Sequence, residues 1–325
     1  MHIKNFCKAI VGLFFFLPMT GSAQSVWKKV DSAFGPLPAG THVFRSTTEI
    51  DGRPNIAYYV SVDLKNRGVR FEVDTTLNRR LKPQEYYERN GNPLVVVNTT
   101  FFSFATNRNL STVIRNGKLV SWSPHVISGK GKDSADYFYV TGSAIGISRK
   151  RAADVTWLYA DSSTRYARSF PHHPVFRKEA YPATGRQRYR YFRKSHNGRI
   201  SSRKWKMDIA VGGGPVLIHD DTIRITNNEE FKFIGKAIHD RHPRTAMGYT
   251  SDGRLIILAV QGRTPGVAEG ADLLHLATIM KELGCYEALN LDGGGSSCLL
   301  INGKQTITPS DKEGQRPVPA VFIVR

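Results

Sequence analysis

The sequence is poor in cysteine, in acidic residues and in long apolar runs, and each shortage excludes a class of protein. Only 3 of the 325 residues are cysteine, which excludes a small scaffold held together by many disulfides. Beyond the N-terminus, no run approaches the roughly 20 apolar residues of a membrane-spanning helix. Asp and Glu number 27 against 46 Lys and Arg, a formal net charge of +19. This charge favours anionic partners: phosphodiesters, acidic glycans, an anionic envelope or nucleic acid.

The N-terminus has the pattern of a secretory signal peptide. Lys4 and Lys8 precede an apolar run at 9–17, and Pro18 and the small residues at 21–23 follow it. We therefore expect residues 1–23 to be removed and the protein to be exported, to the periplasm or the extracellular space. The mature chain would have no integral membrane segment, and the loss of two lysines lowers its net charge to +17.

Hydrophobic patterning predicts a strand-rich fold. Apolar and polar residues alternate over 56–62 and 69–73, as in half-buried strands. A proline at the first turn predicts a short helix at 83–89, and an i, i+3, i+4, i+7 apolar stripe predicts the longest helix at 271–283, ended by Gly284. Most other segments are typical of strands joined by tight turns. The expected class is α+β, with a mainly antiparallel or mixed sheet and a few helices packed on it.

The chain past the signal peptide is long enough for one domain over 24–325, which we expect to begin with a small β region at about 24–80. Residues 149–206 differ in composition, with 16 Lys or Arg against three acidic residues, interleaved with aromatic rings. We interpret them as an insertion. Such a stretch suits an anionic glycan or a nucleic-acid strand, and equally a solvated surface over core aromatics. Cys285 and Cys298 flank one predicted strand and turn, either as buried free thiols or as a bridge.

Three segments share one layout, in which an apolar strand is followed by a polar or glycine-rich break and a hairpin. The breaks lie at 98–102, 212–215 and 292–297. If the three strands belong to one sheet, the breaks line a shared cleft at its edge. The alternative is that all three are simple turns.

The break at 292–297 combines a carboxylate with consecutive glycines. Glycines permit left-handed backbone, close approach of a ligand and a concave nest of N–H groups that binds anions. A turn with Asp292 beside such a nest suits a substrate that has an anionic group, for the N–H donors, next to a reactive carbon, for the carboxylate. The second glycine break strengthens the pattern. The candidate binding residues in the two turns are Gly213, Gly214, Gly293, Gly294, Gly295 and Ser296.

Two arginines at strand ends are candidate anion ligands. Arg244 follows His242 and Pro243 just before a strand, and its planar guanidinium suits two phosphate oxygens. Pairing with an internal carboxylate is the alternative for this residue. Arg263 follows the predicted strand at 255–260, after Gln261 and Gly262, and leads into the loop before the long helix.

Other site chemistries have weaker support. His172–His173 and His239–His242 lack a metal-ligand spacing, so no metal site is expected. Ser296 and Ser297 lack the strand-to-helix elbow of a nucleophilic serine. No cofactor is expected, and Asp292 is the residue on which a hard divalent cation could sit.

These blocks together resemble the phosphodiester glycosidase family. The most specific stretch is 288–297, supported by the segments 212–215, 242–246 and 262–263. The resemblance implies a glycoside hydrolase with Asp292, Arg244 and Arg263 in the active cleft. The usual Asn-Gly-Gly-Phe-Phe of the family is Asn-Thr-Thr-Phe-Phe at 98–102 here, and Ala268 and Glu269 occupy the loop before the long helix, where relatives often carry a serine.

We therefore expect hydrolysis of the glycosidic bond of a sugar-1-phosphodiester in envelope or extracellular glycans. In this hypothesis Asp292 is the base or nucleophile, Glu269 a second carboxylate, and Asn98 positions the sugar or Asp292. The alternative is a non-catalytic binder of anionic envelope glycans. A secreted nuclease or nucleic-acid binder is disfavoured, because no two-metal acidic cluster is evident. The sugar, its anomeric configuration and the choice between inversion and retention stay open.

Overall fold

The computed structural model describes residues 24–129, 134–174, 178–179 and 202–325, and strands dominate these residues. The predicted signal peptide at 1–23 and much of the basic stretch at 149–206 lie outside the described residues. All named strand pairs within the described ranges are antiparallel. The expected antiparallel, broadly α+β architecture is confirmed, with sheets strongly predominating.

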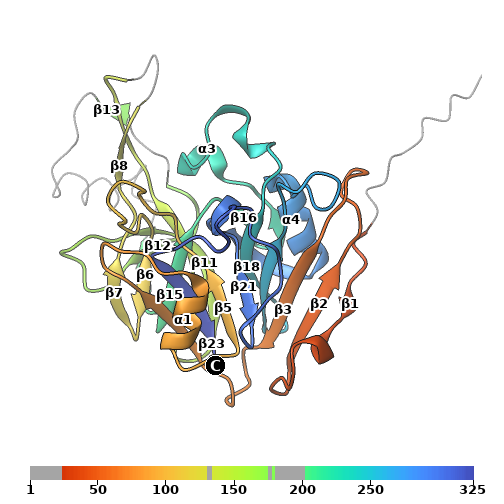
Figure 1. The fold of residues 1–325 in the computed structure, drawn as a ribbon. Helices are drawn as coiled ribbons and strands as arrows, with labels where there is room; N and C mark the ends of the chain where they lie inside the picture. The colour runs from red at the N-terminus through yellow and green to blue at the C-terminus, as the bar shows by residue number, and fades with distance from the viewer. Residues whose placement is uncertain (1–23, 130–133, 175–177, 180–201) are drawn as a thin grey trace, which may run out of the picture.

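An eight-stranded sheet, here the first sheet, holds the three N-terminal strands beside five strands from residues 216–290 (Figure 1). Its order is β1-β2-β3-β19-β18-β20-β16-β17. The strands are β1 (Lys28–Lys29), β2 (Thr41–Ser46), β3 (Ala57–Asp63), β16 (Val216–His219), β17 (Thr222–Ile223), β18 (Arg244–Thr250), β19 (Arg254–Val260) and β20 (Cys285–Asn290). The N-terminal β region is therefore continuous with the strands that carry the candidate site.

Two further sheets pack against the first. The second sheet has the order β14-β12-β11-β10-β15-β6-β7 and the third β22-β21-β5-β23-β4. The strands of the second are β6 (Val113–Arg115), β7 (Lys118–Ser121), β10 (Gly142–Ile147), β11 (Ala153–Tyr159), β12 (Arg168–Phe170), β14 (Arg203–Lys204) and β15 (Ile209–Gly213). Those of the third are β4 (Phe71–Thr75), β5 (Val95–Asn98), β21 (Leu299–Ile301), β22 (Lys304–Gln305) and β23 (Ala320–Val324).

A small sheet and several short helices complete the described chain. The small sheet has the order β13-β9-β8. Its strands are β8 (Val126–Ser128), β9 (Tyr137–Tyr139) and β13 (Lys178–Glu179). The helices are α1 (Pro83–Arg89), α3 (Asn227–Glu230), α4 (Leu273–Glu282) and the 3-10 turns η1 (Asp31–Ala33), η3 (Gly235–Ile238) and η4 (Gly294–Ser296). Within the described residues, none of these helices combines the length and apolar character needed to span a bilayer.

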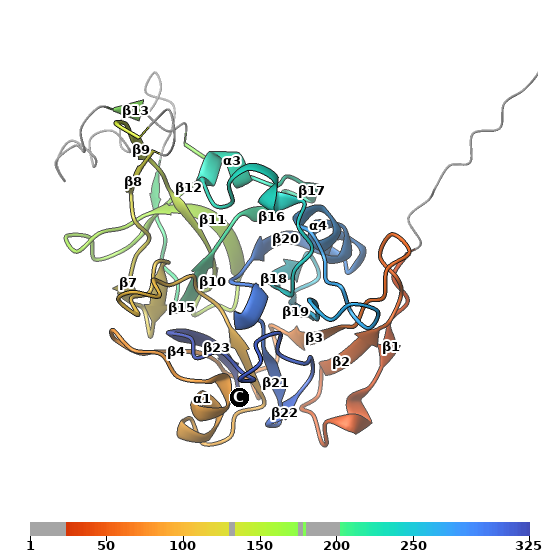
Figure 2. The same ribbon diagram turned by 45° about the horizontal axis from the view of Figure 1, so that its top comes forward.

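The main core is shared by the inner faces of the three sheets, which surround the middle of the molecule (Figure 2). Apolar burial of this kind is the dominant favourable contribution to folding. The core includes Met247 and Leu289 from the first sheet, Trp157 and Val211 from the second, and Val97 and Phe322 from the third. On the outer faces, α4 covers the first sheet and Tyr86 of α1 packs against the third. The buried rings of Trp157, Tyr159 and Trp205 place part of the basic stretch inside the fold.

The two predicted helices form where local sequence favours them. Helix α1 has the predicted bounds, and the Glu85 carboxylate accepts the Lys82 N–H at 2.6 Å, closing its first turn. Helix α4 lies within the predicted range but has only 10 residues. The Asp272 carboxylate caps its N-terminus by accepting the His275 N–H at 2.8 Å, and Gly284 follows in left-handed conformation. Cys285 and Cys298 are free and buried.

The three look-alike strands do not share a sheet. Strand β20 belongs to the first sheet, β15 to the second and β5 to the third. The condition under which we expected a shared cleft, one common sheet, is therefore not met, because each strand pairs with its own antiparallel partners. The breaks that follow the strands nevertheless converge, since the three sheets meet where these strands end.

Candidate active site

The turn after β20 is anchored by backbone hydrogen bonds from two directions. The Asp292 N–H donates to the Thr99 carbonyl at 2.8 Å, and the Leu291 N–H donates to the Thr245 carbonyl at 2.8 Å. Just before the turn, the Gly214 N–H donates to the Asn290 carbonyl at 2.7 Å. These bonds connect the ends of strands from all three sheets, so the predicted meeting of the breaks occurs.

Asn98 ties these segments together with its side chain. Its Oδ1 accepts the Thr245 hydroxyl at 2.9 Å and the Cys298 N–H at 3.0 Å, and its Nδ2 donates to the Asp292 carbonyl at 2.7 Å. The residue has no exposed surface. Of the two roles expected for Asn98, the geometry supports the positioning of Asp292, because its amide is occupied by protein partners.

The Asp292 carboxyl group lies in an environment that resists ionisation. Burial raises its pKa to about 7, although Ser296, the charge of Arg316 and the Gly293 N–H each act to lower it. The Gly293 N–H donates to Asp292 Oδ1 at 3.0 Å. At neutral pH the group is therefore close to half ionised, which is the range in which a carboxyl group can both take up and release a proton.

The glycines of the turn make room for neighbouring segments. A Cβ on Gly293 would lie 2.8 Å from the Pro243 carbonyl, and one on Gly295 would lie 2.2 Å from Arg316 Nη2. Gly294 has φ +61° and sits under the Arg263 guanidinium, with 3.0 Å between its ideal Cβ and Nη2. Close approach, rather than turn shape alone, therefore accounts for three consecutive glycines.

The predicted nest of free N–H groups is not what the turn provides. The Gly293 N–H is bonded to Asp292 Oδ1, and the Gly294 N–H donates to the Pro243 carbonyl at 2.8 Å. Both donors are committed within the protein. Side-chain cations must then supply most of the positive potential for an anionic group at this turn.

Arg244 is a buried cation beside the turn. It is 2% exposed, and it donates from Nε to the Ala271 carbonyl at 2.9 Å and from Nη2 to the Asp240 carbonyl at 2.8 Å. Burial lowers its pKa to about 10, so it stays charged at neutral pH. No carboxylate lies within ion-pair distance among the described residues. The charges of Asp272 and Asp240 favour the ionised form of Arg244 from beyond ion-pair distance, and an anionic ligand in direct contact would offset more of the cost of burying the charge.

Arg263 is a second cation near Arg244, exposed and in left-handed conformation with φ 61°. Its Nε donates to His242 Nδ1 at 3.4 Å. The pKa of His242 is lowered by burial and by the charges of both arginines, so the ring is neutral and can accept this bond. The predicted pair of arginines is therefore brought together on the glycine turn.

Glu269 lies on the neighbouring loop and faces a different partner. Its Oε2 forms an ion pair with Arg53 Nη1 at 2.6 Å, and its N–H donates to the Pro54 carbonyl at 3.0 Å. The ion pair lowers the pKa of Glu269. The loop itself abuts the site, because a Cβ on Gly270 would lie 2.5 Å from the His242 carbonyl. The carboxylate is oriented toward the N-terminal segment by Arg53.

The second glycine break packs against the site from the other side. A Cβ on Gly213 would lie 2.2 Å from the Asn290 carbonyl, so β15 and β20 touch backbone to backbone. Gly214 has φ +120°, and its ideal Cβ falls 2.5 Å from Glu230 Oε2 and 2.4 Å from Lys232 Cε. These contacts bring two charged residues to the site that were not predicted from the sequence.

Glu230 is a fully bonded structural carboxylate. Its oxygens accept hydrogen bonds from Ser143 at 2.6 Å, Trp157 at 3.2 Å, the Val216 N–H at 2.9 Å and Thr226 at 2.6 Å. Lys232 extends from the same loop and lies 5.4 Å from the centre of the Phe101 ring. Burial lowers its pKa, and Glu230 opposes that shift. Neither residue follows a predicted strand or a glycine run, so no local pattern marks them.

The threonines that replace the usual family glycines at 98–102 fit the backbone. Neither Thr99 nor Thr100 has a positive φ. The Thr99 hydroxyl donates to the Ala320 carbonyl at 3.1 Å. The Thr100 hydroxyl and Asn290 Oδ1 are buried without a hydrogen-bond partner. Buried polar atoms without a partner are rare, and the hydroxyl groups of a bound sugar would satisfy them.

Possible metal ligands gather away from Asp292. Among the described residues, His219, Asp220 and Glu287 have ligand atoms within 4.8 Å of one another. His219 Nδ1 is already 3.1 Å from Glu287 Oε1. Asp292 is not part of this group.

Comparison with known proteins identifies the family of the chain. The sequence profile of the family described as phosphodiester glycosidase matches residues 91–325. The chain belongs to the phosphodiester glycosidase family. The profile match includes Asn98, both glycine breaks, both arginines and Asp292, and it begins after strand β4 and helix α1.

Individual relatives agree with this assignment. Human N-acetylglucosamine-1-phosphodiester alpha-N-acetylglucosaminidase is 35% identical over 102 residues, which are 31% of this chain and 19% of that enzyme. The chain thus matches only about a fifth of the length of this relative. The zebrafish catalytic domain of the same name, auto-inhibited by its pro-peptide, has a TM-score of 0.57 at 18% identity, over 93% of this chain and 88% of that one. A hypothetical protein from Synechocystis has a TM-score of 0.59 at 16% identity, over 92% of this chain and 63% of that one.

The Gly213 contact yields a stability prediction. We expect Gly213→Ala to lower the free energy of unfolding by about 3 kcal/mol, because the new methyl group meets the Asn290 backbone, which cannot rotate away. Chemical denaturation measures this loss. Gly314→Ala is the matched control, since no atom lies within 4 Å of its ideal Cβ, and it should cost only about 1 kcal/mol for its left-handed backbone. Equal losses in the two variants would contradict the proposed contact.

The raised pKa of Asp292 predicts a pH-dependent stability. The folded protein holds this proton up to a pH of about 7, whereas the unfolded chain releases it near 3.8. The wild type should therefore lose stability as pH rises from about 4 to about 7, by at most about 4 kcal/mol from this group. Relative to wild type, Asp292→Asn should gain stability over this interval and keep the gain above it. Urea titrations at a series of pH values measure the difference, and a difference that does not vary with pH would refute it.

Proposed function

We propose that the protein hydrolyses the glycosidic bond of a sugar-1-phosphodiester. One observation carries this proposal: the Asp292 carboxyl group, with a pKa of about 7, lies on a turn that Arg244 and Arg263 flank. Neither arginine forms an ion pair with a carboxylate among the described residues. The carboxyl group can exchange a proton or attack a carbon, and the two guanidinium groups can stabilise an anion. Family membership supports the same chemistry.

The leaving group explains the asymmetry of the site. An ordinary glycosidase needs one carboxylic acid to protonate a poor leaving group and a second carboxylate across the ring. The group that leaves a sugar-1-phosphodiester is a phosphate monoester, which departs as a stable anion, so fixed positive charge matters more than an acid. In our proposal Arg244 and Arg263 hold the phosphate, with Lys232 contributing charge from the opposite side.

Asp292 acts at the anomeric carbon. As a base, it removes a proton from water while the oxygen of that water bonds to the carbon and the carbon–oxygen bond to the phosphate breaks. As a nucleophile, its carboxylate bonds to the carbon as the carbon–oxygen bond to the phosphate breaks and the phosphate monoester leaves, and water then hydrolyses the glycosyl ester, which frees the sugar and the Asp292 carboxyl group. Both courses require the ionised form, and Asn98 fixes the backbone that carries it. Glu269 serves as a second carboxylate only if it leaves Arg53.

We place the substrate outside the cytoplasm because of the N-terminal pattern at 1–23. The excess of positive charge fits an anionic carbohydrate there. A groove lined by Lys118, Arg149, Lys150, Arg165 and Lys206 favours binding of such a polymer, and it is the observation that supports the alternative, a non-catalytic glycan binder. In either case the partner is an acidic or phosphorylated glycan.

Asp292→Asn tests catalysis directly. We expect kcat for a methyl N-acetylglucosamine-1-phosphodiester to fall by at least about 10²-fold, the usual contribution of a general base. In the wild type, kcat/KM should rise with pH and level off above about 7, because the ionised form is the active one. Sugar release measured by chromatography reports both. Glycan binding without release by the wild type would instead support the binder.

Glu269→Gln is the companion variant. If Arg53 merely holds the loop, we expect a loss of less than about tenfold, far below that of Asp292→Asn. A loss as large as that of Asp292→Asn would assign Glu269 as the second carboxylate.

Arg263→Ala tests the role of the cations. Because Arg263 is exposed, its removal should leave the fold intact and lower kcat/KM for the phosphodiester by about 10²-fold. The loss with a neutral aryl glycoside of the same sugar should be much smaller. Arg67→Ala, on an exposed turn, is the matched control and should change neither substrate. Equal losses on the two substrates would show that Arg263 does not act on the phosphate.

A further inference from the structure

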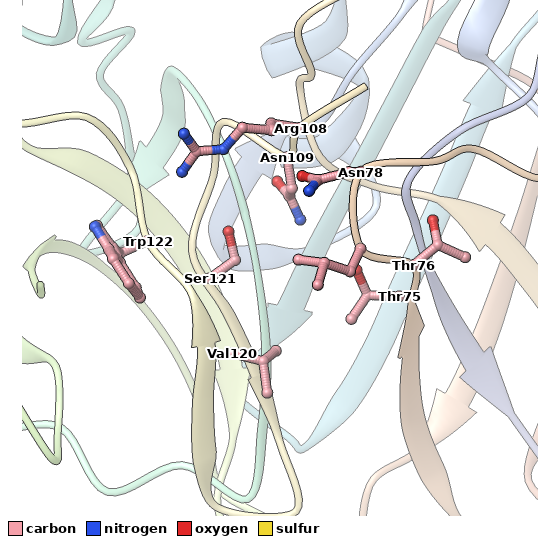
Figure 3. A pocket seen from close by; sticks show the side chains of 9 residues that line it. Thr75, Thr76, Asn78, Arg108, Asn109, Val120, Ser121 and Trp122 are labelled. Carbon is pink, nitrogen blue, oxygen red and sulfur yellow. The ribbon is translucent and has the colours of Figure 1, made fainter. Parts of the chain in front are cut away.

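A pocket of about 320 Å³ lies beside the loop that follows β5, separate from the Asp292 turn. Figure 3 shows Arg108, Asn109 and Asn78 on one side of it and Trp122 on the other. We call it the Trp122 pocket. Its defining residues are Thr76, Asn78, Arg108, Asn109, Ser121 and Trp122. Its volume is at the lower end of the range for small-ligand sites, which suits about one sugar unit.

The walls of the Trp122 pocket combine exposed apolar surface with amide groups. Trp122 is 38% exposed, Val120 44% and Leu77 86%. Asn109 Nδ2 is buried without a hydrogen-bond partner, although Asn109 Oδ1 accepts the Ser111 N–H at 2.9 Å. Sugars present an apolar C–H face and a rim of hydroxyl groups. An indole ring can pack on that face, and a sugar oxygen would satisfy the orphaned amide donor.

The charge of the Trp122 pocket is positive and not neutralised. Arg108 is exposed and forms no ion pair among the described residues. Asp74 adjoins the lining residue Thr75, but it is already paired with Arg89 at 3.0 Å and with Arg115 at 3.5 Å. The pocket itself is lined by no acidic residue. A sugar with an anionic substituent would therefore be preferred over a neutral one.

One loop connects the Trp122 pocket to the Asp292 turn. Asn98, at its start, holds the Asp292 carbonyl, and Asn109, near its end, pairs with Phe102 in an isolated β-bridge. Phe102 is four positions beyond Asn98, a distance of roughly 14 Å at most. With the width of the bridge, the pocket lies within about 20 Å of the turn. A short oligosaccharide can bridge a distance of this size.

We propose that the Trp122 pocket is a second carbohydrate subsite, which binds a remote sugar unit bearing an anionic substituent in the same glycan chain. The assignment to one chain rests on the proposed function. Trp122 packs on the sugar ring, Asn109 donates to a ring or hydroxyl oxygen, and Arg108 pairs with the anion. The subsite thereby selects phosphorylated or acidic glycans over short diesters.

Direct binding tests the subsite without reference to hydrolysis. The probes are maltotetraose and chitotetraose, each with and without a 6-phosphate, measured by calorimetry and by quenching of tryptophan fluorescence. We expect Trp122→Ala to weaken binding of the phosphorylated probes about tenfold. Arg108→Ala should also weaken binding of the phosphorylated probes about tenfold, and it should leave binding of the unphosphorylated probes unchanged. Trp122→Phe should restore most of the affinity. The matched controls are Leu274→Ala and Arg67→Ala, both on exposed surface outside the pocket, and neither should alter binding.

The outcomes separate the two proposals. Binding that depends on Trp122 and Arg108 supports the subsite, even if no diester is hydrolysed. Binding that is unchanged in both variants, or the absence of binding by all four probes, overturns it, even if the methyl diester is cleaved. Circular dichroism of each variant verifies the fold. If Trp122→Ala does not fold, Arg108→Ala and Trp122→Phe still decide between these outcomes.

Discussion

The carboxamide of Asn98 is the constraint on which the site depends. It makes one hydrogen bond to the carbonyl of Asp292, one with the hydroxyl of Thr245 and one with the N–H of Cys298. Thr245 is adjacent to Arg244, so a single buried side chain fixes the backbone of the acid relative to that of a cation. A buried amide with satisfied partners is rigid, because every alternative orientation loses a bond that water cannot replace. The three sheets supply the strand ends, and this amide sets their mutual distance.

Local burial, rather than the net charge of the chain, governs the electrostatics of the site. With 46 basic residues one would expect every carboxyl group to be easily ionised, yet the pKa of Asp292 is raised. Desolvation outweighs the one cation that acts strongly on it, since Arg316 shares its charge with Asp311 through bonds of 2.7 and 2.9 Å. Neither Arg244 nor Arg263 is among the groups that shift the pKa of Asp292. Acid and cations thus keep separate roles within a small volume.

Local elements were predictable, whereas the way in which distant segments meet was not. The bounds of α1 and the left-handed Gly284 follow from proline, glycine and apolar spacing, which act within one or two turns of chain. The strands β5, β15 and β20 were recognisable as strands, but a strand does not encode which sheet it will join. Asp292 and the two arginines stood out because each follows or begins a strand beside a special residue. Lys232, Glu230 and Arg316 carry no such mark and reach the site through tertiary packing alone. The bond from the Gly294 N–H to the Pro243 carbonyl could not be predicted either, because Pro243 lies far along the chain.

The two thiols have a consequence for how the folded chain can be observed. Burial raises the pKa of Cys298 to about 12 and raises that of Cys285 as well, so neither exists as thiolate in the native state at neutral pH. Oxidants and alkylating reagents attack the thiolate. Cys298 also donates its N–H to Asn98, so it becomes accessible only when the segments joined by that amide separate. The rate at which Cys298 is modified under native conditions therefore reports how often the segments joined by Asn98 separate.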